Sequence, residues 1–485
     1  LNDVNPILSC RGTTLSILSK RPNLQNMIKL KEFDIRLVEV QTALLASDIN
    51  RAHNNLQEEL FLATSMIDLI TPCQAVGINA EAAIQLESAN TLWDQGEVSS
   101  SIGILQALDD AVLLKNQTIT VPRSHVLAKI GNQVSIAKLE KADRIICKYL
   151  RPALEDLGGQ LEGREAGQVF HQFASFCDQQ LQDPDLLEDL ERVKQMSKAK
   201  AQEVKDYERL IAQAPSLERK RECQSRQLKA KAWLKIDERD LERQNSNREE
   251  FLSNCLENYL LSLVASNNHN KNALRFLALW LEHSEEKIAN NAVAKHLKKV
   301  PSMKFANLMN QLASRLQDSK QTFQELLFQL VMQICSDHPF HGMYQVFAGA
   351  YSDTNDKDET AVSRKNATRK LVNRLCESKT NRKIWMAIQS TSKAYCSLAG
   401  EKKSRYKAGK VFQLDESPAA TNLNNVVKMN PIPSPTRQVS LSLSLDYSKL
   451  PVIIKIKSEF LIASGISAPK IITTLASNGE KFKQL

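Results

Sequence analysis

The sequence is poor in glycine, proline and aromatic residues: it has 15 glycines, 15 prolines and 6% aromatics in 485 residues. A chain of this length is too long for one compact core. Hydrophobic residues at 42% and charged residues at 25% are ordinary for a folded protein, which excludes disorder of the whole chain. Together these features favour an extended, mostly helical architecture.

The nine cysteines are scattered and include no close Cys-x-x-Cys pair. This spacing implies no disulfide or zinc framework and fits reduced thiols in the cytosol or nucleus. No apolar run reaches the roughly 18 residues that a membrane span needs, and the N-terminus has no signal-peptide pattern. We therefore expect a soluble intracellular protein. Because the sequence starts with Leu1 and not with methionine, we expect it to be an internal portion of a larger protein.

The chain also lacks a large excess of charge of one sign: it has 64 basic and 55 acidic residues, and its net charge is only +9. The basic clusters at 219–221 and 229–231 could contact nucleic acid, or they could lie on a solvated helix face with ion pairs one turn apart. A mild excess for this length favours the second interpretation. Direct nucleic-acid binding is not expected from this chain.

Apolar residues recur at helical spacing over most of the chain, which predicts stacked antiparallel helix pairs with almost no strand before residue 439. Residues 81–108 read as a tetratricopeptide-type hairpin with its turn at Gly96. The charged run at 186–250 predicts two long helices broken near 214–215. The segments 251–264 and 273–281 are apolar almost all round and predict the rigid centre of the stack.

Two pairs of polar residues are of the types found in catalytic or metal sites, but the other residues that such a site needs are not near them in the sequence. His171 and Asp178 could form a catalytic pair, but no positioned nucleophile accompanies them, and surface positions on a packed helix are the default. His338 and His341 could ligate a metal, but no third ligand is nearby. Pro339 suits the first turn of a helix, so a helix start and a packing role are favoured there.

The end of the chain predicts β-structure. A segment rich in proline and polar residues at 416–438 reads as a linker that cannot continue a helix. After it, residues 439–445 alternate strictly, 452–462 have the β-branched and aromatic residues of a strand, and 471–476 and 480–485 read as two more strands joined by an Asn-Gly hairpin.

The loop between the strands 452–462 and 471–476 contains Ser464, Gly465 and Lys470. Such a turn can place backbone N–H groups and a cation over a phosphate chain, and it can equally be an ordinary hairpin loop. Gly465 would let the main chain approach a ligand, and Lys470 could reach phosphate oxygens or pair with an acid elsewhere.

Four stretches of the sequence resemble successive signatures of a known family. They are RFLALWLEH at 275–283, KFANLMNQLASRL at 304–316, SDHPFH at 336–341 and KSEFLIASGISAPKIITTLASNGEKFKQL at 457–485. They are similar to the FAT region and the first kinase strands of the phosphatidylinositol-kinase-related protein kinases, and within that family to the ATM branch and its fungal members. Phe340 stands where the family usually has the first of two adjacent histidines.

The resemblance implies an α-solenoid of antiparallel helix pairs, the FAT helical-repeat region, at 1–415, a linker at 416–438, and the first strands of a kinase N-lobe at 439–485. It changes the prediction for the loop with Ser464, Gly465 and Lys470, which becomes a candidate ATP phosphate loop. The catalytic lysine, the aspartate that positions the acceptor and the magnesium ligands of such kinases are expected beyond Leu485, so none is assigned here.

For the whole protein, the resemblance implies a nuclear serine/threonine kinase that uses ATP and Mg²⁺. It would act on hydroxyls followed by glutamine in DNA double-strand-break signalling, DNA repair and telomere maintenance. The implied partners are the rest of the kinase domain, a second copy in a homodimer, protein substrates and a DNA-break sensor complex, with no membrane. A helical-repeat scaffold or a pseudokinase of the same family, with no phosphate transfer, remains the alternative.

Overall fold

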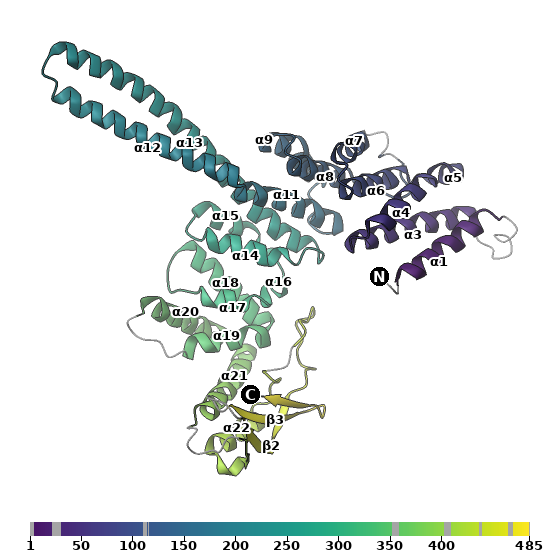
Figure 1. Cartoon of the computed structure of the whole chain (residues 1–485). Coiled ribbons are helices and arrows are strands. Elements are labelled where there is room, and N and C mark those ends of the chain that lie inside the picture. Colours follow the sequence, from purple (N-terminus) through teal and green to yellow (C-terminus); the bar gives the residue numbers. More distant parts are fainter. Residues whose placement is uncertain are drawn as a thin grey trace. The chain divides into compact units, whose positions relative to one another are not determined.

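The computed structural model describes residues 4–21, 31–109, 114, 116–351, 358–401, 409–435, 439–463 and 469–484. They fall into two compact units, Leu1–Asn272 and Ala273–Leu485. Figure 1 shows helices in the first unit, and helices with one small sheet in the second. No helix in the described ranges is both long and apolar enough to cross a membrane. The mostly helical fold class is confirmed.

In the described part of the first unit, the helices from α1 to α10 pack against one another. The predicted hairpin at 81–108 is present as α6 and α7, and its turn contains Gly96 at a φ of +86°, a conformation that glycine adopts without strain. The elements are α1 (Val4–Ser19), α3 (Glu32–Ala52), α4 (Leu56–Ile67), α5 (Ile70–Ala75), α6 (Glu81–Asp94), α7 (Val98–Leu108), α8 (Arg123–Ile136), α9 (Ala142–Ile145), the π-helix η1 (Ile146–Leu150) and α10 (Arg151–Asp156).

Three longer helices complete this unit: α11 (Arg164–Gln182), α12 (Pro184–Ala212) and α13 (Leu217–Ala265). The predicted break near 214–215 is confirmed, and Ser216 caps α13 by accepting a hydrogen bond from the backbone N–H of Arg219. We expected the apolar segment 251–264 to be a separate helix. This is wrong, because α13 runs through it without interruption. No proline or glycine interrupts the chain between the charged and the apolar halves.

The helices of the second unit surround a core of large aromatic side chains. Trp280 is fully buried, lies 5.0 Å from the ring of Phe323, and donates its indole N–H to Asn290 Oδ1 at 2.9 Å. The elements are α14 (Asn272–Glu282), α15 (Lys287–His296), η2 (Leu297–Lys299), α16 (Met303–Ala306), α17 (Met309–Ser314), α18 (Thr322–Asp337), α19 (Pro339–Tyr351), α20 (Glu359–Leu375) and α21 (Lys379–Gly400). Asp358 caps helix α20, because its side chain accepts hydrogen bonds from the backbone N–H groups of Thr360 and Ala361.

The sheet contains four antiparallel strands in the order β1-β2-β3-β4: β1 (Val411–Gln413), β2 (Ile453–Ile462), β3 (Lys470–Ala476) and β4 (Lys481–Gln484). The last three are the strands predicted from 452–485. Gly479 in the predicted Asn-Gly turn has a φ of +85°, and its N–H donates to the carbonyl of Ala476 at 2.9 Å. The register shifts twice within β2: the three residues from Ile453 to Lys455 face two residues of β3, and the five residues from Ile456 to Phe460 face three.

The structure corrects three predictions made for residues 411–445. Strand β1 lies before residue 439 and pairs with β2, so the helical region is not free of strand up to that point. The segment predicted as a linker, 416–438, contains a helix, α22 (Pro418–Met429), which Ser417 caps and in which Pro418 occupies the first turn. The alternating segment 439–445 is described throughout and forms no strand, because none of the strands in the described ranges pairs with it.

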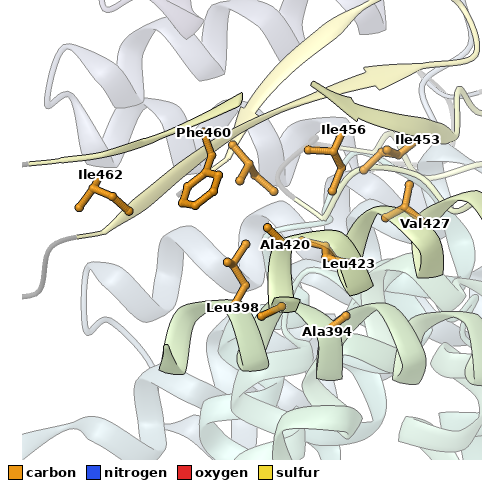
Figure 2. Packing of buried hydrophobic residues seen from close by; sticks show 11 residues of the cluster. Ala394, Leu398, Ala420, Leu423, Val427, Ile453, Ile456, Phe460 and Ile462 are labelled. Carbon is orange, nitrogen blue, oxygen red and sulfur yellow. The ribbon is translucent and has the colours of Figure 1, made fainter. Parts of the chain in front are cut away.

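Helix α22 and the end of α21 cover one face of the sheet. Figure 2 shows Leu398 of α21 and Leu423 of α22 directed toward Ile456 and Phe460 of β2. All four side chains are at most 4% exposed. The sheet therefore shares its core with the last two helices and does not form a body separate from them.

Candidate functional site

The predicted phosphate loop connects β2 to β3. Ser464 and Gly465 lie outside the described residues, and so do 466–468. The flanking residues are described: the N–H of Ala463 donates to the carbonyl of Pro469 at 2.9 Å, and Lys470 pairs with Ile462 as the first residue of β3. The two ends of the connection are therefore held together where β2 ends and β3 begins, as a loop over a ligand would require.

Lys470 is the one predicted site residue that the structure describes. Its Nζ donates to the carbonyl oxygen of Ala399 at 3.0 Å and to that of Glu401 at 3.1 Å. Both carbonyls belong to the C-terminal end of α21, where the last four carbonyls of a helix have no partner within it and the helix dipole favours a cation. A contact between this ammonium group and phosphate stays a prediction.

The same end of α21 meets two further elements of the sheet. The side chain of Glu401 accepts a hydrogen bond from Ser417 Oγ at 2.8 Å, and Ser417 is the N-cap of α22. The N–H of Gly409 donates to the carbonyl of Ile462 at 2.7 Å, which joins the start of β1 to the end of β2. We call the cluster of Ala399, Glu401, Gly409, Ser417, Ile462 and Lys470 the junction. It joins α21, α22, β1, β2 and β3.

The face of the sheet opposite α22 carries exposed lysines, among them Lys455, Lys457 and Lys481. They line a shallow hollow of about 210 Å³ together with Ser458 and Thr473. These ammonium groups attract anions, a phosphate chain among them, and the Glu459 carboxylate, whose Oε1 lies 4.0 Å from Lys457 Nζ, offsets part of the positive charge. In the described part of the chain, no group of three or more His, Cys, Asp or Glu side chains could hold a metal ion.

The SDHPFH motif at 336–341 fastens the chain that leads into β2. Nδ1 of His338 lies 2.6 Å from the hydroxyl of Tyr447, and Nε2 of His341 lies 2.9 Å from the carbonyl oxygen of Val439. The ring of Phe340 meets Tyr447 edge-on at 5.9 Å. Burial lowers the pKa of His338 and outweighs the opposing effect of the Asp337 carboxylate, so His338 favours its neutral form.

The packing role expected for this motif is therefore what the structure shows, and Pro339 is the first residue of α19 as predicted. Sequence reasoning missed Tyr447, which supplies most of the contacts. It stands more than a hundred residues after the motif, and no spacing rule connects the two positions.

The residues His171 and Asp178 have different partners and do not form a catalytic pair. His171 stacks on His269 with ring centroids 4.4 Å apart and lies 3.0 Å from the side-chain nitrogen of Asn272. Asp178 accepts a hydrogen bond from the hydroxyl of Tyr259 at 2.8 Å. Both residues of α11 thus contribute to packing inside the first unit.

Comparison with known proteins gives close relatives along the whole chain, although no protein-family model matches it. A serine/threonine-protein kinase TEL1 from Gibberella zeae is 48% identical over 99% of this chain, and one from Neurospora crassa is 47% identical over all of it. Each match covers 16% of the relative, so the chain spans about one sixth of the curated relatives it matches.

Solved structures agree with the sequence comparison. The structure titled "FAT and kinase domain of CtTel1" superposes with a TM-score of 0.87 at 48% identity and covers 100% of this chain and 32% of its own. The open conformation of CtTel1 gives a TM-score of 0.89 at 49% identity and covers 100% of this chain and 18% of its own. A third structure, titled "Tel1 kinase butterfly symmetric dimer", has a TM-score of 0.72 at 21% identity and shows the fold alone.

Helix pairs followed by a small antiparallel sheet, with α21 and α22 packed under it, match the class of structure formed by the FAT and kinase N-terminal region of Tel1, a phosphatidylinositol-kinase-related kinase. The resemblance seen in the sequence is thereby confirmed. Within that class, the chain is a homologue of one segment of the Tel1 kinases, the ATM-type serine/threonine kinases.

Proposed function

We propose that this chain is the part of an ATM-type serine/threonine kinase in which the FAT helices meet the kinase N-lobe. The intact protein would transfer the γ-phosphoryl group of ATP to a serine or threonine hydroxyl followed by glutamine, with release of ADP and a proton. The observation that supports this most strongly is 47–48% identity to Tel1 kinases along the whole chain.

In this proposal the sheet supplies part of the nucleotide site. The connection with Ser464 and Gly465 would lie over the phosphates of ATP, and backbone N–H groups would contact them. The lysines beside the hollow, Lys455, Lys457 and Lys481, would add positive potential where three or four negative charges must be held. Mg²⁺ would be held by residues outside this chain, and so would the aspartate that positions the acceptor hydroxyl.

The proposed setting is the nucleus, with signalling of DNA double-strand breaks and telomere maintenance as the process. A DNA-break sensor complex and protein substrates would be the partners. A solved relative at 48% identity is titled "Complete CtTel1 dimer with C2 symmetry", and this supports a homodimer of the intact protein. We place the dimer contacts on the helical region.

The experiment is a transfer assay with the purified intact protein, ATP and Mg²⁺. The acceptor is a peptide with one Ser-Gln site, and the matched control peptide differs only by alanine in place of that glutamine. Transfer to the first peptide and much less to the second is expected. Binding of ATP with no transfer to either peptide would favour the pseudokinase, and the absence of nucleotide binding would favour a helical scaffold.

A further inference from the structure

We infer that Lys470 is a positioning residue: it fastens the start of β3 to the C-terminal carbonyls of α21 and so holds the proposed nucleotide-binding sheet in place against the FAT helices. This inference rests on the proposed function, because it gives Lys470 a role in that site. It differs from the expectation that the ammonium group itself meets phosphate.

The first argument is the way in which the ammonium group is used. An ammonium group has three N–H donors, and Lys470 directs two of them at the carbonyls of Ala399 and Glu401. These oxygens belong to the end of a 22-residue helix, so the cation also lies at the negative end of the helix dipole. Both effects hold the side chain on α21 before any ligand is present.

The second argument is that the other contacts of the junction tie the same helix end to the sheet. Glu401 accepts a hydrogen bond from Ser417, the cap of α22, and α22 packs under β2. The carbonyl of Lys410 accepts from the N–H of Ile462 at 3.1 Å, so the chain that leaves α21 pairs with the last residue of β2. The strands on both sides of the proposed phosphate loop are therefore attached to α21.

The third argument is the sequence position of Lys470 itself. It follows Pro469, whose missing N–H and fixed φ stiffen the entry to β3. It is also paired with Ile462 in the sheet, so the backbone of Lys470 cannot move without moving β2. A side chain rooted on such a rigid residue transmits a displacement of α21 directly to the two strands.

If Lys470 fastens β3 to α21, its loss changes the protein even when no nucleotide is bound. If Lys470 contacts phosphate, its loss matters only when a nucleotide is bound. We would compare Lys470→Met with Lys470→Arg in the intact kinase, and use Lys428→Met as the control. Lys428 is an exposed lysine on α22, outside the junction and the hollow. Two measurements are needed: amide hydrogen exchange in the nucleotide-free enzyme, and KM and kcat for ATP with binding of ATP, ADP and adenosine.

Lys470→Met is expected to raise exchange about tenfold at the amides of 398–401 and 470–472 in the nucleotide-free enzyme, since two hydrogen bonds to a charged group are lost at a partly exposed site. KM for ATP should rise several-fold with little change in kcat, and ATP, ADP and adenosine should all bind more weakly by a similar factor. Lys470→Arg keeps the charge and the donors and should retain most of the protection, and Lys428→Met should resemble the unchanged protein.

Two results would overturn the inference. One is unchanged exchange in the nucleotide-free enzyme together with weaker ATP and ADP but normal adenosine, which is the pattern of a direct phosphate contact. The other is an equal effect of Lys428→Met, which would show that only the net charge of this region matters. If the intact protein bound no nucleotide, the proposed function would fail, and the exchange measurement would still test the attachment of β3 to α21.

Discussion

Leu423→Ala tests whether the segment between the FAT helices and the strands is part of the core of the sheet. Leu423 of α22 is 0% exposed and packs in the cluster with Ile456 and Phe460. Replacing a buried leucine by alanine typically costs about 2–5 kcal/mol, from lost burial and from the cavity left behind. A central value of about 3 kcal/mol corresponds to roughly a hundredfold change in an opening equilibrium.

The assay is amide hydrogen exchange of β2 and β3 in the intact protein, because the exchange rate reports the local opening equilibrium. The matched control is Met429→Ala, on the same helix but 74% exposed, for which a change within about 0.5 kcal/mol is expected. We expect roughly a hundredfold faster exchange in β2 for Leu423→Ala and almost none for Met429→Ala. Equal exchange in the two variants would refute the shared core.

Three further outcomes follow from contacts in the two units. Gly342→Ala should destabilise the second unit by about 1–3 kcal/mol, because the added Cβ would lie 2.8 Å from the Cys335 sulfur and 3.2 Å from the Cys335 Cα. Thermal unfolding measures this loss of stability, and an unchanged midpoint would contradict the prediction. Tyr447→Phe should cost about 1 kcal/mol through the lost hydrogen bond to His338, seen as faster exchange near 439–450. Burial lowers the pKa of His269 to about 4 from its ordinary value near 6.5. Between these pH values the unfolded chain binds more protons than the folded one, so stability should fall as the pH drops from about 6.5 to 4. His269→Asn should flatten that part of the curve of melting temperature against pH.

Most of the helices and the last three strands could be predicted from the sequence because their signals are local. The helical spacing of apolar residues, the break at 214–215 and the Asn-Gly turn depend on neighbours within a few positions, and all three are confirmed. Local signals also existed for α22, where Ser417 and Pro418 form a helix start and Leu423 and Val427 lie one turn apart. The prolines that follow the helix indicate a linker, and in the sequence this signal is stronger than the signal of the helix start.

The errors in the sheet arise from pairing between distant residues. β1 has three residues, too few for any periodicity, and only its partner in β2, some fifty positions later, makes it a strand. The strict alternation at 439–445 has the opposite problem: its pattern is that of a strand, but among the described residues no strand pairs with it. In β2 the buried residues Ile453 and Ile456 are three positions apart, which needs the register shift and not simple alternation.

The same limit applies to the candidate site. A lysine near a glycine in a loop was enough to propose a phosphate contact, but the two carbonyls that Lys470 meets lie about seventy positions earlier. Backbone carbonyls carry no residue-specific signal, so no reading of the sequence could find them. The motif with His338 was visible because it resembled a family signature, whereas its partner Tyr447 was not.

Helix α13 has a mechanical consequence. Its 49 residues correspond to a rod about 70 Å long. One half pairs with α12, and the other half, from Phe251 to Leu263, is buried against α11. Since no proline or glycine hinge separates the halves, a torque applied to the charged half would reach the buried half with little loss. A force on the pair of helices α12 and α13 would therefore be transmitted to Phe176 of α11, whose ring meets Phe251 edge-on at 6.4 Å.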